Sequence, residues 1–224
     1  MDRLKIIARI RSPFAEKFGV PRQSGLVQQV HASVIFEPEY RIAEAVRGLS
    51  DFSHIWLIWQ FSGNLGRDWS PTVRPPRLGG NERMGVFATR SPFRPNAIGM
   101  SSVRLDGIDY DPGLGPVLRI SGADLMDGTP ILDIKPYLAY TDSHPDAAGG
   151  FTDTSEMDLL EVEFPSVLLE KIPEDLRDGL TGVLRCDPRP RYQDDPERVY
   201  GLTYGGRNVK FTVSDGVLKV TGVE

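Results

Sequence analysis

Short apolar runs rich in β-branched and aromatic residues recur through the first two thirds of the chain. The most apolar of them, Phe52 to Phe61, has a length that suits a strand buried on both faces better than a helix. Further strand-like runs, each bounded by turn residues, occupy positions 4–10, 27–36, 84–88, 100–108, 116–120 and 130–134. Short strands at this spacing predict an all-β barrel or sandwich for residues 1 to about 141.

Helical spacing of apolar residues is confined to two places. Residues 41–49 predict one short amphipathic helix within the strand-rich part. A polar segment rich in Gly and Ala, residues 142–154, is typical of a linker. Beyond it, a strand-like run at 159–164 precedes a helical stretch at 167–184. Three further strand-like pieces follow within 198–223, separated by turns at 205–206 and 215–216. Together they predict a small α+β domain over 155–224. The expected fold is therefore mainly β, with an all-β barrel or sandwich domain at 1–141 and a small α+β C-terminal domain at 155–224.

The composition of the 224 residues, 40% hydrophobic and 25% charged, is that of an ordinary globular chain. No stretch approaches eighteen apolar residues, so we expect no membrane span. The first ten residues do not resemble a secretory signal, which favours a cytoplasmic protein. One cysteine, Cys186, and three widely spaced histidines, His31, His54 and His144, offer no metal-ligand spacing and make Cys-His catalysis improbable.

The net charge of −5 taken alone argues against a nucleic-acid partner, because phosphate contacts need Lys and Arg. Positive charge is nevertheless concentrated in two stretches. Residues 1–23 carry six bases and two acids, and residues 67–104 carry seven arginines and two acids. The compensating acids lie in residues 142–198, with fifteen acids against six bases. The charge is therefore unevenly distributed, with two basic stretches toward the N-terminus and an acidic C-terminal third.

The densest candidate site is the run from Gly85 to Ser102. A strand there leads into a loop in which two prolines fix the backbone on either side of Arg94, leaving Arg90, Asn96 and several hydroxyls to face outward. Rigid polar loops on a strand scaffold commonly bind ligands, since little ordering entropy is lost on binding. A well-formed turn with solvated arginines explains the same residues about equally well.

A second candidate is the run Leu125-Met126-Asp127-Gly128-Thr129 and the strand that follows it. Asp-Gly between apolar segments indicates first of all a hairpin turn. Beyond the turn, the alternation of a strand places Asp133, Lys135 and Tyr137 on one face, where an acid, a base and a phenol meet. An exposed ion pair beside a tyrosine is the simpler explanation of this pattern.

The common nucleotide-binding and nucleophile motifs are absent from the sequence. No complete dinucleotide fingerprint, no phosphate-binding Gly-x-x-x-x-Gly-Lys loop and no Gly-x-Ser-x-Gly elbow occurs.

Several long stretches nevertheless resemble the TrmO family, also called TsaA-like or YaeB, of S-adenosylmethionine-dependent tRNA methyltransferases. The matching runs are residues 10–23, 52–56, 72–80, 85–100 and 124–137, and the tail including Asp187 to Tyr192 is similar to the C-terminal unit of the bacterial branch. The resemblance implies a β-barrel catalytic domain, a homodimer, and methylation of the exocyclic nitrogen of threonylcarbamoyl-adenosine beside the tRNA anticodon.

Carried over onto matching positions, the resemblance also implies the residues that hold S-adenosylmethionine. They are Pro21, Arg22, Gln23, Arg90, Ser101, Ser102, Leu125, Met126, Asp127, Gly128 and Thr129. Relatives have a histidine-containing pair at the end of the aromatic strand, where this chain has Ser62 and Gly63, so that a contact here has to use the main chain.

A sulfonium methyl donor is already activated, so the protein mainly positions donor and acceptor and accepts one proton. Asp133, oriented by Lys135, is the candidate acceptor, with Tyr137 as an alternative or a stacking surface. Asn96 is placed to hydrogen-bond the adenine or the carbamoyl group. The expected contacts to the tRNA anticodon loop come from Arg74, Arg77, Arg83 and Arg94.

Two other functions fit the same residues. A barrel that binds RNA through its arginine loops needs no methyl donor, and an enzyme of the same fold could act on another nucleotide or small molecule. Binding of S-adenosylmethionine separates the first from catalysis, and the methylated nucleosides of cellular tRNA separate the second.

Overall fold

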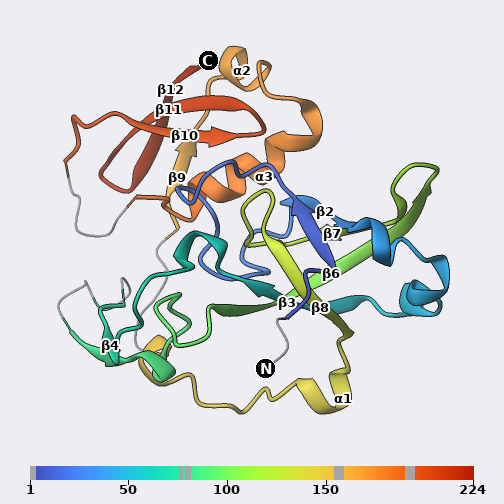
Figure 1. Ribbon diagram of the computed structural model, residues 1–224. Coiled ribbons are helices and arrows are strands. Elements are labelled where there is room, and N and C mark those ends of the chain that lie inside the picture. Colours follow the sequence, from blue (N-terminus) through green and yellow to red (C-terminus); the bar gives the residue numbers. More distant parts are fainter. Residues whose placement is uncertain (1–3, 76–77, 79–81, 154–158, 190–194) are drawn as a thin grey trace.

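The first part of the chain forms a closed, six-stranded antiparallel barrel (Figure 1). The computed structural model describes residues 4–75, 78, 82–153, 159–189 and 195–224. The barrel strands, in the order β1-β2-β7-β6-β3-β8, are β1 (Ala8–Arg11), β2 (His31–Phe36), β7 (Gly115–Ser121), β6 (Ile98–Asp111), β3 (His54–Gln60) and β8 (Pro130–Pro136). The sequence-based prediction of a mainly β fold with an N-terminal barrel is confirmed, and closure leaves none of these strands at an open edge.

The barrel is filled by alternate side chains of its strands. In β3, Ile55, Leu57 and Trp59 are buried inside, whereas the residues between them are only half-buried on the outer face. The prediction that this strand is buried on both faces is wrong, because a six-stranded barrel fills its interior with one face of each strand and covers the other only in part.

The short helix predicted at 41–49 is also wrong. The chain forms two separate 3-10 turns there, Ala43–Val46 and Leu49–Asp51, and only Val46 is buried. Gly48 lies between them with φ +81°, a left-handed conformation that no continuous α-helix contains. Further 3-10 turns lie at Pro38–Tyr40, Ser62–Asn64, Val86–Ala88 and Gly150–Thr152.

A small ribbon stands beside the barrel in the arginine-rich loop region. It consists of β4 (Thr72–Val73) and β5 (Met84–Gly85), and the strand predicted at 84–88 is therefore only two residues long before a 3-10 turn.

The C-terminal unit is a four-stranded sheet with helices against it (Figure 1). Its strand order is β10-β11-β12-β9, with β9 (Glu161–Glu163), β10 (Tyr200–Tyr204), β11 (Arg207–Ser214) and β12 (Val217–Val223). The helices of this unit are α2 (Ser166–Leu169) and α3 (Glu174–Arg185), whereas α1 (Ala139–Asp142) directly follows barrel strand β8 and lies away from this sheet (Figure 1). The helical stretch predicted at 167–184 is thus divided, because Pro173 interrupts it with an extended backbone and serves as the N-cap of α3. The turns at 205–206 and 215–216 are present.

Residues 12–30, here called the connecting segment, pack between the barrel and the C-terminal unit. Phe14 is fully buried in the C-terminal core, with its ring edge-on to Tyr204 at a centroid distance of 5.3 Å. The amide of Gly205 donates a hydrogen bond to the carbonyl of Pro13 at 2.8 Å. Gly19 approaches Leu202 so closely that an added Cβ would overlap its Cδ1 atom. The strand predicted from residue 27 therefore begins only at His31, since the residues before it serve the interface.

No helix among the described residues is long and apolar enough to cross a membrane.

Candidate active site

A polar cluster joins the connecting segment to the inside of the barrel. Arg90, just beyond the 3-10 turn that follows β5, donates a hydrogen bond through its guanidinium to Oε1 of Gln23. The side-chain amide of Gln23 donates in turn, through Nε2, to the main-chain carbonyl of Arg22 at 2.5 Å. Two of the loops that the resemblance assigns to the methyl donor, residues 21–23 and the loop of Arg90, are therefore in direct contact.

Ser101 and Asp124 continue this cluster toward the core. Ser101 is buried on the inner face of β6, accepts a hydrogen bond from Nε1 of Trp59 at 3.0 Å, and donates one to Oδ1 of Asp124 at 2.6 Å. Burial raises the pKa of the Asp124 carboxyl above its ordinary value, and the Ser101 hydroxyl, the amides of Asp124 and Ser24 and the charge of Arg90 oppose that rise. We call Gln23, Arg90, Ser101 and Asp124 the Arg90–Asp124 cluster.

Asp124 is a site residue that the sequence reasoning missed. The residues around it, from Ser121 to Ala123 and Leu125, are all buried, so the carboxylate is an acid inside an otherwise buried stretch. A perturbed acid among polar partners often marks a functional site.

The turn at Asp127-Gly128 is present, but it is not a hairpin. Residues 122–126 form no strand, and the turn is fixed instead by the barrel start, where Gly128 (φ +74°) donates its amide proton to the Ile10 carbonyl at 2.8 Å. Oδ1 of Asp127 accepts a hydrogen bond from the Ser12 amide at 3.0 Å. Thr129, which is buried, donates its hydroxyl proton to the carbonyl of Met126 at 2.7 Å. Leu125 is buried as well, so this turn offers mainly main-chain groups to a ligand.

Asp133, Lys135 and Tyr137 lie at the end of β8. Nζ of Lys135 is 2.9 Å from Oδ2 of Asp133, and both side chains are about half exposed. The Tyr137 ring packs against His54 and Trp56 of β3, at centroid distances of 6.1 and 5.6 Å. The acid, the base and the phenol therefore share a partly open surface beside β3.

This surface and the Arg90–Asp124 cluster lie on opposite faces of the same sheet. Asp133 pairs with Ile58 on the outer face of β3, whereas Ser101 pairs with the inward-facing Leu57. The structure consequently does not bring Asp133 and Ser101 together within one chain. Ser102, which pairs with Trp56, belongs to the outer face.

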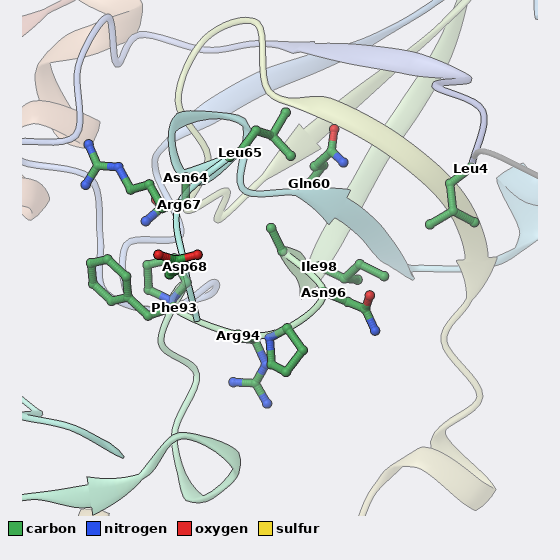
Figure 2. Close-up of a pocket in the computed structure, with 14 residues that line it drawn as sticks. Leu4, Gln60, Asn64, Leu65, Arg67, Asp68, Phe93, Arg94, Asn96 and Ile98 are labelled. Atoms are coloured by element: carbon green, nitrogen blue, oxygen red, sulfur yellow. The ribbon is translucent and has the colours of Figure 1, made fainter. Parts of the chain in front are cut away.

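Asn96 and Arg94 line an open hollow of about 210 Å³ between the start of β6 and the turn after β3 (Figure 2). The Arg94 guanidinium donates to the carbonyl of Thr89 at 2.7 Å and to that of Val86 at 3.3 Å, and it lies 5.9 Å from the centre of the Phe87 ring. Part of its hydrogen-bonding capacity thus holds its own loop in shape.

The remaining sequence-predicted residues are dispersed. Ser62 and Gly63 are exposed in a 3-10 turn, where the Ser62 carbonyl accepts the Leu65 amide proton at 3.4 Å. Arg74 and Arg83 are exposed beside the β4–β5 ribbon, and Arg77 lies outside the described residues.

A second cavity, of about 380 Å³, separates the connecting segment from the end of α3. It is lined by residues 17–22 and Leu26 on one side and by Val183 and residues 186–189 on the other. Pro21 and Arg22 therefore face the C-terminal unit as well as the barrel. Burial raises the pKa of the Cys186 thiol in this wall, which makes it a poor nucleophile at neutral pH.

Comparison with known proteins identifies the class to which this arrangement belongs. The model of the tRNA-methyltransferase O N-terminal domain matches residues 9–143, and that of the TrmO C-terminal domain matches residues 157–224. A tRNA (adenine(37)-N6)-methyltransferase of Escherichia coli K12 is 44% identical over 97% of this chain and 96% of its own length. A candidate S-adenosylmethionine-dependent methyltransferase of Pseudomonas aeruginosa, RcsF, is 41% identical over 88% of this chain and 86% of its own.

A solved structure of TrmO from Pseudomonas aeruginosa has the same fold, with a TM-score of 0.81 and 34% identity, covering 100% of this chain and 97% of the other. The barrel, the C-terminal unit and these matches define a tRNA-modifying methyltransferase. The chain belongs to the tRNA-methyltransferase O (TrmO) family.

Proposed function

We propose that this protein transfers a methyl group from S-adenosylmethionine to the exocyclic nitrogen of adenine 37 in tRNA, where that adenine carries a threonylcarbamoyl group. The observation that carries the proposal is the 44% identity over nearly the full length of both chains to the Escherichia coli tRNA (adenine(37)-N6)-methyltransferase. The division into a barrel unit (1–141), a linker (142–154) and a C-terminal unit (155–224) belongs to the same proposal.

The Arg90–Asp124 cluster fits the chemistry of the donor. S-adenosylmethionine carries a carboxylate, an ammonium group and a sulfonium, and it supplies the activated methyl group when bound. Arg90, with Arg22 beside Gln23, offers a cation for the carboxylate, and the Asp124 carboxylate offers an acceptor for a cation. Main-chain groups of Ser62, Gly63 and the turn from Leu125 to Thr129 complete the proposed donor site, together with Pro21. Ser102, which lies on the outer face of β6, is not part of it.

The groups at the end of β8 have the properties needed to accept a proton. The nitrogen that is methylated loses a proton, and its lone pair is delocalised into the purine, so that a nearby base favours the transfer. Asp133 is the proposed acceptor, and Lys135 at 2.9 Å holds its carboxylate in one orientation. Tyr137 offers its ring as a stacking surface for the base, supported by Trp56.

A second copy of the chain is part of the proposal. Within one chain the proposed acceptor and the proposed donor site lie on opposite faces of the sheet formed by β8, β3 and β6. A homodimer that juxtaposes the outer face of one protomer with the donor site of its partner would bring the two groups together. Ile98 and Met100 of β6 leave that outer face partly apolar and exposed.

The tRNA anticodon loop is the proposed partner of the arginine-rich loops. Arg74 and Arg83 are exposed beside the ribbon, and Arg94 stands at the mouth of the hollow that contains Asn96. Guanidinium groups suit phosphates and the threonyl carboxylate because they bind such anions in a bidentate manner. Arg77 is proposed for the same role from its sequence position, and a tRNA substrate implies a cytoplasmic enzyme.

Mass spectrometry of nucleosides from tRNA of a deletion strain tests the substrate directly. We expect the methylated threonylcarbamoyl-adenosine to disappear and the unmethylated form to increase, and expression of the gene from a plasmid to reverse both changes. An unchanged methylated peak would refute the substrate assignment. Calorimetry with S-adenosylmethionine tests the donor, since a barrel that only binds RNA would show no heat of binding.

A further inference from the structure

The hollow in Figure 2 is lined in part by side-chain carboxamides that make no hydrogen bond to the described residues of the protein. Its wall is formed by Leu4, Gln60, residues 64–68 and residues 92–98. Gln60, Asn64 and Asn96 each contribute an amide group, and within the described ranges none of the three makes a hydrogen bond through its side chain. Each therefore has a free donor and a free acceptor in the wall of the hollow.

Apolar side chains in the same wall are open to solvent. Phe93 is 38% exposed, Ile98 37% and Leu65 55%. Apolar and aromatic surfaces next to unused carboxamides match an unstacked nucleobase, which has two flat apolar faces and an edge of alternating donors and acceptors. A volume of about 210 Å³ suits one base and no larger folded ligand.

Main-chain hydrogen bonds hold this wall in place. The amide of Phe61 donates to the Ala97 carbonyl at 2.8 Å, and the amide of Asn64 donates to the Phe61 carbonyl at 2.9 Å. The amide of Ser70 donates to the carbonyl of Phe93 at 3.2 Å. Because the two sides of the hollow are linked, a ligand loses little binding energy to ordering the site.

Two arginines at the margin suit the backbone that such a base would carry. Arg67 and Arg94 both line the hollow, and Figure 2 shows their side chains extending outward in different directions, with Asp68 next to Arg67 on the same loop. Guanidinium groups at the rim of a base pocket bind the adjoining phosphates, and the pocket itself distinguishes the base.

We infer that the hollow is a nucleobase-binding site that receives an unpaired base of the RNA substrate, with Gln60 and Asn64 reading its edge beside Asn96. The inference rests on the proposed function, in that the RNA is the tRNA whose adenine is methylated. Gln60 and Asn64 are thereby assigned to recognition of the base. Neither residue belongs to the proposed donor site.

Two variants that keep volume and remove hydrogen bonding test the inference in the full chain. Gln60→Met and Asn64→Leu should each raise the Kd for tRNA about tenfold at fixed salt, the loss expected for one base contact. The Kd for S-adenosylmethionine, measured by calorimetry, should stay unchanged. Gln28→Met, in an exposed glutamine outside the hollow, is the matched control and should alter neither constant.

Three results would overturn the inference. The first is wild-type affinity for tRNA in both folded variants. The second is weakened binding of S-adenosylmethionine, which would make the hollow part of the donor site. The third is a change of oligomeric state in sedimentation, which would make it a contact between copies. Binding of tRNA by the wild type without methylation would refute the proposed function alone, and the effect of the two variants on tRNA affinity would still decide the base site.

Discussion

Replacing Gly19 by alanine tests how the connecting segment is held against the C-terminal unit. Gly19 has φ +86°, which costs an alanine roughly 1–2 kcal/mol. The new Cβ would also overlap Cδ1 of Leu202, which is fully buried, and overpacking of this kind costs typically 1–3 kcal/mol. We therefore expect Gly19→Ala to lower the free energy of unfolding by about 2–5 kcal/mol.

Gly25→Ala is the matched control. Gly25 has φ +78° in the same segment, but its added Cβ would meet no atom within 4 Å. The control should lose only the conformational contribution, about 1–2 kcal/mol. The difference between the two variants isolates the contact with Leu202.

Urea unfolding followed by circular dichroism measures both variants, provided that the m-value is unchanged. Leu202→Ala alone should cost about 2–5 kcal/mol by leaving a cavity, and combining it with Gly19→Ala should cost less than the sum, because the overlap is removed. Equal losses for Gly19→Ala and Gly25→Ala, with additive effects in the double variant, would refute the close packing.

Three further predictions concern the site. Arg90→Ala should weaken binding of S-adenosylmethionine about tenfold or more in calorimetry, since it removes a charged hydrogen-bond donor; an unchanged Kd would remove Arg90 from the donor site. Asp133→Ala should lower kcat about 100-fold or more while leaving donor affinity nearly intact, because a lost proton acceptor acts on turnover; equal small effects on both would make its ion pair with Lys135 merely structural. Asp124→Asn should change the pH dependence of stability. The raised pKa means that the folded protein holds a proton which the unfolded chain releases near 3.8, so this group's contribution is present below that pH and is lost as pH rises through the folded pKa. The unfolding free energy of the wild type should thus fall more steeply with pH in this range than that of the variant, and parallel profiles would contradict a perturbed Asp124.

The barrel could be predicted from sequence because strand patterns are local. Runs such as 52–61 and 130–134 carry their own β-branched residues and turn boundaries. The order of the strands and the closure of β1 onto β8 could not be predicted, since those pairings join residues far apart in the sequence, by more than one hundred positions for β1 and β8. The spurious helix at 41–49 shows the limit of periodicity: the apolar spacing was right, but a left-handed Gly48 interrupts it.

The candidate site, too, could be predicted from the sequence only in part. Polar loops that contain Arg90 and Gln23 are recognisable from their composition, and the resemblance to a family singles them out, but their contact across 67 positions is visible only in the fold. Asp124 escaped notice because burial, and not residue type, gives it its raised pKa. The alternation that groups Asp133 with Lys135 also leaves open which face of the barrel they occupy, and the structure places them on the outer one.

Methyl transfer to defined tRNA tests the central claim most directly. The full chain is incubated with methyl-labelled S-adenosylmethionine and either tRNA that carries threonylcarbamoyl-adenosine at position 37 or the same tRNA with plain adenosine there, and the nucleosides are analysed by mass spectrometry. The account predicts label on the exocyclic nitrogen of the threonylcarbamoyl nucleoside and far less on plain adenosine. Label on another nucleoside, or none in protein that binds both donor and tRNA, would contradict it.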